Sequence, residues 1–451
     1  MFKGVYELPP GHVMVFSQAN FEGKLIKFWS EGAGKTLSDY VDPKLSFEQQ
    51  FESLLVDSVR FRLISDVPVG TYNSGGLDSS LTTAITRSLT NGELHTFSVG
   101  FEEADYDESA YAQIIAKQLK THHHTLVINE REYLNAYEQT VSHLEEPLNH
   151  AHTVQLLLLS KFAKQYVTVV LTGEGSDELF GGYPRFQIPL LADSLSVFPR
   201  ALTRGALETS RWFGSRKIVK LLENADDPAQ AVIENARHTP RQDFEALCSG
   251  PHPFPERLKL YREAENRKES ALGRLLYFDQ RSYLPALLKR LDKASMAAAI
   301  ECRVPYLDYR LVEWSALLPP KLKVQVGRDN KVIVKNVGRK WIPQEIVSRK
   351  KVGFGVPISR WLLNPQGLGR YFDLITDTTF KHRGYCQPEA VEKLIREHRS
   401  GKSDHSEILW GLVNLELWWR LFVDSTNWAR NVSPPWGASQ SKAMTEATAL
   451  V

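Results

Sequence analysis

The stretch Ser74-Gly75-Gly76-Leu77-Asp78-Ser79-Ser80 constrains this chain more than any other part of the sequence. An apolar run at 67–73 precedes it, and apolar residues at helical spacing follow it as far as Leu89. This order predicts a strand, a glycine turn and the start of a helix. Glycines let a ligand approach the backbone, and the first amides of a helix attract anions. The turn therefore favours a phosphate chain as its ligand, although an ordinary strand-to-helix turn with capping serines would show the same pattern.

Strands and helices alternate around this turn. Strand patterns at 94–101, 124–128 and 167–172 are separated by helical patterns at 107–119 and 153–164. The β-branched run at 167–172 suits a parallel strand that is buried on both faces. The alternation predicts an α/β fold with a doubly wound, mainly parallel sheet, whose ligand lies at the carboxyl ends of the strands. After about residue 190 helical periodicity dominates, so we expect a helical C-terminal part.

Composition excludes several classes of function. The 451 residues include 55 basic and 53 acidic side chains, so the charges nearly cancel and nothing indicates a nucleic-acid or polyanion binder. The three cysteines, Cys248, Cys302 and Cys386, are far apart in sequence, which predicts neither a disulfide framework nor a zinc site. The apolar stretch 408–423 is interrupted by polar residues and favours an amphipathic core helix over a membrane span. We expect a reducing, cytoplasmic location.

One stretch resembles a phosphate-binding motif but lacks two of its required features. Gly32-Ala33-Gly34-Lys35-Thr36 resembles the end of a Walker A loop. That loop requires a glycine five residues before Gly34, where this chain has Trp29, and no buried strand leads into it. We interpret these residues as a linker. The short strand patterns before them are too few for an independent sheet and must dock on something else.

A second turn carries most of the acidic candidates. The strand at 167–172 runs into Thr172-Gly173-Glu174-Gly175-Ser176-Asp177-Glu178-Leu179-Phe180-Gly181-Gly182-Tyr183. A dinucleotide fingerprint would need a glycine at position 178, which is Glu. Carboxylates at the carboxyl end of a strand, beside a phosphate-binding turn, instead indicate metal coordination and general-base chemistry. Asp78 in the first turn is likewise a poor phosphate contact but a suitable Mg²⁺ ligand. A solvated acidic turn is the alternative.

Together, these two turns resemble the synthetase domain of the asparagine synthetase family, a branch of the N-type ATP pyrophosphatases. Further matches keep the family's order: Phe97-Ser98-Val99-Gly100-Phe101, Tyr106-Asp107-Glu108, Arg290-Leu291-Asp292-Lys293-Ala294-Ser295-Met296, Arg303-Val304-Pro305-Tyr306-Leu307-Asp308 and Lys350-Lys351-Val352-Gly353-Phe354-Gly355-Val356-Pro357. The resemblance spans residues 47–425 and implies an adenine nucleotide alpha-hydrolase-like core at 47–190. A mainly helical part at 191–425 and a mobile tail at 426–451 would follow.

The resemblance implies a ligase that uses ATP to adenylate a carboxylate, releases pyrophosphate, and then transfers ammonia to form an amide. It implies that the pyrophosphate moiety is held by Ser74, Gly75, Gly76, Asp78 and Ser79. It places Asp78 and Asp177 on Mg²⁺, and Val99, Thr172 and Gly173 in the nucleotide pocket. It implies that Glu174 orients or deprotonates the amine, that Lys351 stabilises transition-state charge, and that Asp292 takes part in handling substrate or amine.

The start of the chain departs from the family pattern. Family members begin with a glutaminase domain that has a catalytic Cys after Met, whereas position 2 is Phe and no Cys precedes Cys248. Residues 1–46 resemble only the closing strands of that domain plus a linker. We therefore expect no glutamine hydrolysis. The nitrogen would come from free ammonia, another amine, or a separate glutaminase subunit that docks on residues 1–45.

Several points stay open at this stage. His150 and His152 could mark a carboxylate other than aspartate, or could be exposed or capping residues. The run His122-His123-His124 favours a structural role over a metal site, since no carboxylate or Cys partner has matching spacing. Two alternatives to the ligase stay open. A tRNA-thiolating ATP pyrophosphatase usually requires a reactive Cys pair, which the three distant cysteines do not suggest. The other alternative is an inactive nucleotide-binding scaffold. We expect neither nucleic acid nor membrane as a partner, and a homodimer stays open.

Overall fold

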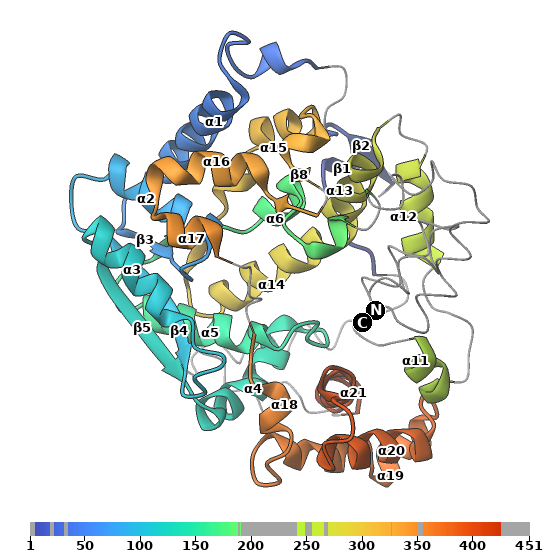
Figure 1. Cartoon of the computed structure of the whole chain (residues 1–451). Coiled ribbons are helices and arrows are strands. Elements are labelled where there is room, and N and C mark those ends of the chain that lie inside the picture. The colour runs from blue at the N-terminus through green and yellow to red at the C-terminus, as the bar shows by residue number, and fades with distance from the viewer. Residues whose placement is uncertain are drawn as a thin grey trace. The chain divides into compact units, whose positions relative to one another are not determined.

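A computed structural model describes residues 5–18, 22–30, 35–187, 190, 241–248, 255–265, 269–325, 327–349 and 355–424 (Figure 1). These residues divide into two compact units. The first contains the described parts of 1–129, 155–243 and 250–356, and the second contains those of 130–154, 244–249 and 357–451. The expected tail at 426–451 and the candidate Lys351 lie outside the described residues. No helix in the described ranges has the length and apolar character that crossing a membrane requires.

The first unit is built on a five-stranded sheet whose strands are all parallel. Its order is β5-β4-β3-β6-β7, with β3 (Val69–Tyr72) in the middle. The other strands are β4 (His95–Phe101), β5 (His122–Ile128), β6 (Val169–Leu171) and β7 (Glu301–Arg303). The chain builds outward from β3 to β4 and β5, and then returns to the other side of β3 to add β6 and β7. The predicted α/β fold with a doubly wound parallel sheet is confirmed.

This strand order has a topological switch point between β3 and β6, where Thr71 pairs with Leu171. Ligands of open α/β sheets bind at such a point, outside the carboxyl ends of the strands. The turn at Ser74 follows β3, and the turn at Gly173 follows β6. The sheet therefore brings together two motifs that are distant in the sequence.

Helices connect and cover these strands. In the first unit they are α1 (Phe47–Arg62), α2 (Leu77–Leu89), α3 (Ser109–Leu119), α5 (His152–Ala163, which begins in the second unit), α6 (Ser176–Phe180), α12 (Pro255–Glu265), α13 (Ala271–Ser282), α14 (Leu284–Met296), α15 (Tyr309–Ala316), α16 (Val332–Trp341) and α17 (Gln344–Ser348). A small hairpin, β8 (Val324–Gln325) and β9 (Asp329–Asn330), precedes α16. Helix α1 begins with a capping box, in which Ser46 and Gln49 exchange hydrogen bonds.

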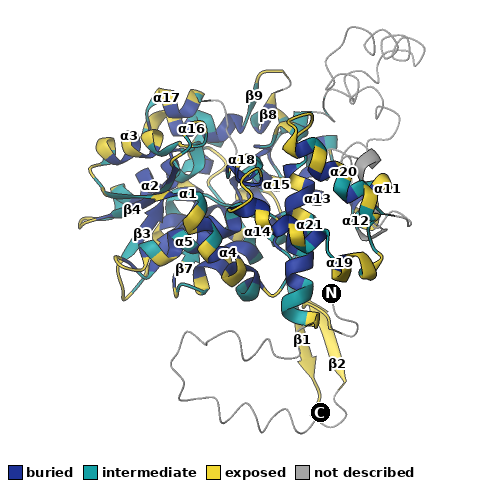
Figure 2. Cartoon of the chain, turned by 90° about the horizontal axis from the view of Figure 1, so that it is seen from below, coloured by how far each residue is buried: buried dark blue, intermediate teal, exposed yellow. Residues whose placement is uncertain are grey.

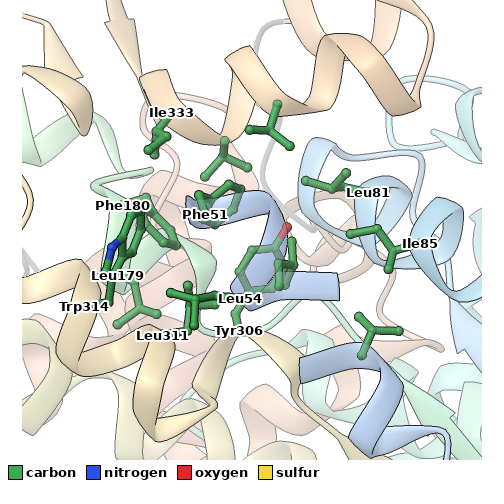
Figure 3. Packing of buried hydrophobic residues seen from close by; sticks show 14 of the residues in the cluster. Phe51, Leu54, Leu81, Ile85, Leu179, Phe180, Tyr306, Leu311, Trp314 and Ile333 are labelled. Carbon is green, nitrogen blue, oxygen red and sulfur yellow. The ribbon is translucent and has the colours of Figure 1, made fainter. Parts of the chain in front are cut away.

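A buried aromatic cluster supports the helices behind the two turns (Figure 3). Phe51 of α1 contacts Phe180 of α6 edge to face at 5.1 Å, and it stacks on Trp314 of α15 at 6.2 Å. The indole N–H of Trp314 donates to the Gln50 side chain at 3.0 Å, so its polar atom is satisfied in the core. Burying such rings is worth several kcal/mol each by transfer free energies of about 25 cal/mol/Å². This packing fixes α6, which carries Asp177 and Glu178.

The N-terminal residues form a hairpin that is exposed along most of its length (Figure 2). Strands β1 (His12–Phe16) and β2 (Gly23–Lys27) pair antiparallel, with Val13 opposite Ile26 and Met14 opposite Leu25. Neighbouring pairs point to opposite faces, so both faces of the hairpin carry exposed apolar side chains. Residues 5–8, which precede this hairpin and belong to the short strand patterns of the sequence, form no strand.

A buried carboxylate ties the segment after the hairpin to the first unit. Glu313 of α15 accepts hydrogen bonds from Trp29 Nε1 at 2.6 Å, Lys35 Nζ at 2.7 Å and Tyr40 Oη at 2.6 Å. Lys35 is the lysine of the false Walker motif, and here it serves as an ion-pair partner of Glu313. The glycines of that motif lie outside the described residues.

The second unit is helical. It contains α4 (Glu130–Leu144), the end of α11 (Arg241–Leu247), α18 (Ile358–Trp361), α19 (Thr378–Arg383), α20 (Pro388–Arg399) and α21 (Ser406–Trp419). Helix α21 covers most of the apolar stretch at 408–423, and its burial confirms a core helix. Glu416, fully buried within it, binds the guanidinium groups of Arg383 and Arg420 at 2.6 and 2.8 Å. Glu416 and Arg420, two polar residues of this stretch, therefore form ion pairs that stabilise the unit.

Candidate active site

The glycine turn after β3 has the backbone conformation that its sequence demands. Gly75 has φ +69°, and a Cβ there would lie 2.5 Å from the backbone N of Ala112 and from Tyr111 Cβ. Only glycine fits such a position. The Ser74 and Ser79 hydroxyls lie 3.0 Å apart across the turn, and Ser79 Oγ also accepts from the backbone N–H of Ser74 at 3.2 Å. The turn therefore presents two hydroxyls beside the first turn of α2, where the amides lack partners within the helix.

The second turn packs directly on the first. A Cβ on Gly173 would lie 2.7 Å from the backbone N of Ser79 and 2.9 Å from Asp78, so this position needs glycine for close approach. The Ser176 hydroxyl donates to Asp78 Oδ1 at 2.7 Å. The switch point of the sheet thus brings Ser74, Asp78, Ser79 and Gly173 into one site.

A buried lysine joins the two acidic candidates. Lys331 Nζ lies 2.5 Å from Asp78 Oδ2 and 2.6 Å from Asp177 Oδ1, and its side chain is only 6% exposed. Burial alone would lower the pKa of Lys331, but the Asp177 and Asp78 carboxylates outweigh it and raise that pKa above its usual value. The ammonium group is therefore a fixed cation held between two carboxylates, at the carboxyl ends of β3 and β6.

Sequence reasoning missed Lys331. It precedes α16 with a left-handed backbone, φ +55°, which is costly for a residue with a Cβ. A Cβ on Gly182 would collide with both Asp177 and Lys331, so another glycine of the second motif makes room for this pair. The available signal was a charged residue directly before an apolar helix, which is too common to single out.

The Asp78 and Asp177 carboxylates are also suitable ligands for a magnesium ion. Mg²⁺ prefers oxygen ligands and usually takes only one or two protein carboxylates, with water and phosphate oxygens completing its shell. Asp78 and Asp177 share one cation here, which demonstrates that their oxygens converge. Within the described ranges, no group of three or more His, Cys, Asp or Glu side chains is arranged to hold a metal by itself. The pair therefore fits a metal that a nucleotide helps to bind.

Glu174 is held by an arginine from α14. Arg290 Nη2 lies 3.2 Å from Glu174 Oε1; the arginine side chain is 5% exposed and the glutamate side chain 27%. Glu174 is thus open to solvent on one side and fixed on the other. Arg290 belongs to a motif that the sequence singled out, but its role as the partner of Glu174 was not predicted.

Two other candidates lie on β4 and α14. Val99, half-buried in β4, packs against the cluster that includes Tyr72 and Phe97. Asp292 is exposed on α14. Both Asp292 and Glu174 act on the same neighbour: burial raises the pKa of the Cys302 thiol to about 12, and these two carboxylates add to the rise. Thr172 is nearly buried beside Gly173 and accepts from the Glu174 amide at 3.3 Å.

Glu178 is a buried acid next to the site. Burial and the adjacent Asp177 charge raise the pKa of Glu178 to about 7, while a hydrogen bond from the Tyr183 hydroxyl at 2.6 Å acts in the opposite direction. Burial and the Asp177 charge therefore both favour the protonated form of this carboxyl. The Tyr183 hydroxyl holds this carboxyl in place, so we assign Glu178 a role in supporting α6.

The histidines lie elsewhere. His95 at the start of β4 and His124 of β5 pack together, with His95 Nδ1 and His124 Nε2 3.0 Å apart and Tyr166 against His124. This group lies at the amino ends of the strands, opposite the ligand edge. His150 and His152 stack on each other in the second unit at 4.9 Å.

Two cysteines that are distant in sequence are close in space. Cys248 Sγ and Cys386 Sγ lie 4.0 Å apart in the second unit, and all three cysteines are free thiols. Sequence spacing gave no sign of this pair, because 138 positions separate its members.

Five parallel strands around this switch point, with a helical C-terminal part, define the adenine nucleotide alpha-hydrolase-like class of fold. The profile of the family described as Asparagine synthase matches residues 50–420, so the chain belongs to that family.

Two asparagine synthetases and an amidase are among the curated relatives that match the chain. The chain is 30% identical over 382 residues to "Asparagine synthetase [glutamine-hydrolyzing] 1" of Bacillus subtilis, covering 83% of this chain and 60% of that protein. It is 29% identical over 380 residues to "Putative asparagine synthetase [glutamine-hydrolyzing]" of Mycobacterium tuberculosis H37Rv, covering 83% and 58%. It is 26% identical over 443 residues to "Amidase chyE" of Penicillium rubens, covering 87% and 65%. The chain therefore spans about three-fifths of the length of these relatives.

Proposed function

We propose that this protein is an ATP-dependent, AMP-forming ligase that adenylates a substrate carboxylate and then transfers ammonia or another amine to it. The observation that carries the proposal is the Lys331 bridge between Asp78 and Asp177. It places one fixed cation and two metal-compatible carboxylates beside a glycine turn, at the switch point of the sheet. Family membership supports the same chemistry.

In the first half-reaction, a carboxylate oxygen of the substrate attacks the α-phosphorus of ATP. The bond from that phosphorus to the oxygen shared with the β-phosphate breaks, and pyrophosphate leaves with the electron pair. Negative charge grows on the leaving group and must be met by preorganised donors. The Ser74 and Ser79 hydroxyls, the first amides of α2 and the Lys331 ammonium would supply them. A Mg²⁺ ion held by Asp78 and Asp177 would add charge neutralisation on the phosphate oxygens.

In the second half-reaction, an unprotonated amine attacks the acyl carbon and AMP leaves. The attacking nitrogen must lose a proton, and a nearby carboxylate can accept it. We assign this task to Glu174, which Arg290 holds at 3.2 Å while one side stays exposed. A guanidinium group can donate two parallel hydrogen bonds to a carboxylate, which limits the orientations that the carboxylate adopts. A fixed orientation suits a base that must accept a proton from a small amine.

Free ammonia and ammonia from a glutaminase are both compatible with this site. For the second source we propose that a glutaminase docks on the β1–β2 hairpin. Both hairpin faces carry exposed apolar side chains, with Val15 52% exposed on one face and Phe16 63% exposed on the other, which suits a strand pair packed between other sheets. Two of the relatives quoted above carry "glutamine-hydrolyzing" in their names and are longer than the matched region.

The acid is either aspartate or a specialised biosynthetic carboxylate. ATP–pyrophosphate exchange tests the proposal with aspartate and a panel of carboxylic acids, followed by product analysis with ammonium added. Exchange with at least one acid and formation of its amide are expected. Absence of exchange with every acid would reject the ligase and favour a scaffold or a tRNA-modifying enzyme.

Lys351 provides a second test of the same proposal. Lys351→Ala should abolish exchange while the thermal unfolding temperature stays near that of the wild type, because the proposed role concerns transition-state charge. Unchanged exchange in this variant would remove Lys351 from the catalytic residues.

A further inference from the structure

An arginine from a distant segment reaches the glycine turn. Arg349 follows α17, and its Nη1 donates to the backbone carbonyl of Gly75 at 3.3 Å. Its guanidinium carbon lies 3.8 Å from the centre of the Tyr111 ring, and it also forms an ion pair with Glu108. Glu108 and Tyr111 stand at the start of α3, and the arginine side chain is only 12% exposed. Three partners therefore fix one guanidinium over the turn.

The other side of Gly75 is fixed as well. Its backbone N–H donates to Asn73 Oδ1 at 3.1 Å, and Asn73 Nδ2 donates to the Ala112 carbonyl at 3.0 Å. Asn73 is fully buried, so this contact is rigid. Asn73 thus holds the peptide before Gly75, and Arg349 holds the peptide after it.

The peptide after Gly75 matters because of where its N–H points. In a planar trans peptide the C=O and the N–H point in opposite directions. With the Gly75 carbonyl turned to Arg349, the Gly76 N–H points to the other side, where Ser74 Oγ accepts it at 3.4 Å. Ser74 Oγ lies beside Ser79 Oγ, on the side assigned above to the pyrophosphate.

A Gly-Gly peptide has little to keep it in place by itself. Neither residue has a Cβ, so rotation of this peptide meets few steric barriers. A flipped peptide would turn a carbonyl oxygen, in place of an N–H, toward the serine pair, and a partial negative charge there repels phosphate. An external contact must therefore select the orientation that binds an anion.

We infer that Arg349 is a positioning residue for the phosphate chain: it holds the Gly75–Gly76 peptide so that the Gly76 N–H faces the ligand. The inference rests on the proposed function only in naming ATP as the ligand. Lysine cannot replace Arg349, because an ammonium lacks the planar fork that stacks on Tyr111 while donating to Gly75 and Glu108.

Isothermal titration calorimetry with Mg²⁺ and α,β-methylene-ATP, an analogue that cannot release pyrophosphate, tests the inference. Arg349→Met should weaken analogue binding roughly tenfold or more, as expected for a lost charge-assisted hydrogen bond. Arg349→Lys should recover little of it. Arg339→Met, an exposed arginine on α16, is the matched control and should bind like the wild type.

Adenosine binding separates positioning from general damage to the fold. The orientation of the Gly75–Gly76 peptide affects only the contact with phosphate. Adenosine affinity should therefore be unchanged in Arg349→Met, while inorganic pyrophosphate should bind more weakly. Equal losses for adenosine and the analogue, or an analogue affinity like that of Arg339→Met, would overturn the inference. Should Arg349→Met fail to fold, Glu108→Gln must show a smaller loss of analogue affinity in the same direction.

The two proposals can fail separately. If the wild type shows no pyrophosphate exchange with any acid but binds the analogue in an Arg349-dependent way, the ligase is rejected and the positioning role stands. If exchange occurs and Arg349→Met leaves analogue affinity unchanged, the positioning role is rejected and the ligase stands. If the wild type does not bind the analogue, the positioning role is rejected, and the exchange assay alone decides the ligase.

Discussion

Replacing Lys331 by methionine tests the role of its ion pairs with Asp78 and Asp177. Methionine fills much of the same volume but leaves Asp78 and Asp177 facing each other without a cation. Removing one partner of a buried ion pair costs about 3–5 kcal/mol, because a charge is left uncompensated. The two carboxylates are 19% and 20% exposed, so water can relieve part of this cost. We therefore expect a loss of about 3 kcal/mol in the free energy of unfolding, at the lower end of that range.

Magnesium should reverse much of this loss. In the wild type a divalent ion must displace the ammonium group from Asp78 and Asp177, whereas in Lys331→Met the two carboxylates are available. Each tenfold excess of Mg²⁺ over its dissociation constant adds about 1.4 kcal/mol to the stability of the folded state. Without nucleotide, Mg²⁺ should stabilise Lys331→Met clearly and the wild type hardly at all.

Thermal and urea unfolding at neutral pH, with millimolar Mg²⁺ or with chelator, measure both effects. Lys340→Met is the control, since Lys340 is an exposed lysine at the other end of α16 whose partner is Glu52. The reasoning is refuted if Lys331→Met is no less stable than Lys340→Met, or if Mg²⁺ shifts both variants equally. Adding Asp177→Asn to Lys331→Met should restore stability, because it removes the repulsion between carboxylates.

Three further predictions follow from other contacts. Arg290→Met should lower ammonia-dependent amide formation about tenfold, the scale of one lost charge-assisted hydrogen bond, because Arg290 holds Glu174. ATP–pyrophosphate exchange should stay intact, because Glu174 is assigned to the amine step; an equal loss in both assays would contradict this. The raised pKa of Glu178, about 7, means that its contribution to stability is present below its ordinary pKa and is lost as pH rises through about 7. Glu178→Gln should therefore flatten the fall in unfolding temperature between about pH 4.5 and 7, and an unchanged pH profile would exclude it as the cause. Finally, mild oxidation with a disulfide reagent should join Cys248 to Cys386, whose sulfurs are 4.0 Å apart, and leave Cys302 as the one titratable thiol after unfolding; three remaining thiols would contradict this.

Local chemistry made the central part of the fold predictable. The strand, glycine turn and helix around Ser74 follow from an apolar run, glycines and helical spacing, and the structure has them as β3, the turn and α2. The strands β4, β5 and β6 were predicted within a few residues for the same reason. Strand β7 was missed, because its residues Glu301-Cys302-Arg303 are few and mostly polar and only the sheet edge makes them a strand.

Partnerships across the chain were the unpredictable part of the site. The two turns were expected to meet, because both follow parallel strands. Lys331 stands directly before a helix and Arg349 directly before a recognised motif, so neither belongs to a pattern that marks it as a site residue, and only the packing around α16 and α17 reveals them. The Cys248–Cys386 pair is the same kind of case, since sequence distance says nothing about distance in a fold.

The glycine contacts between the two turns have a consequence for evolution and engineering. Gly173 leaves no room for a side chain against Ser79, and Gly182 leaves none against Asp177 and Lys331. A change in one turn therefore alters the space available to the other, although a long stretch of chain separates them. The turns should be inherited as one composite motif, so a chimaera that takes one turn from a relative should take the other, together with the lysine before α16, from the same parent.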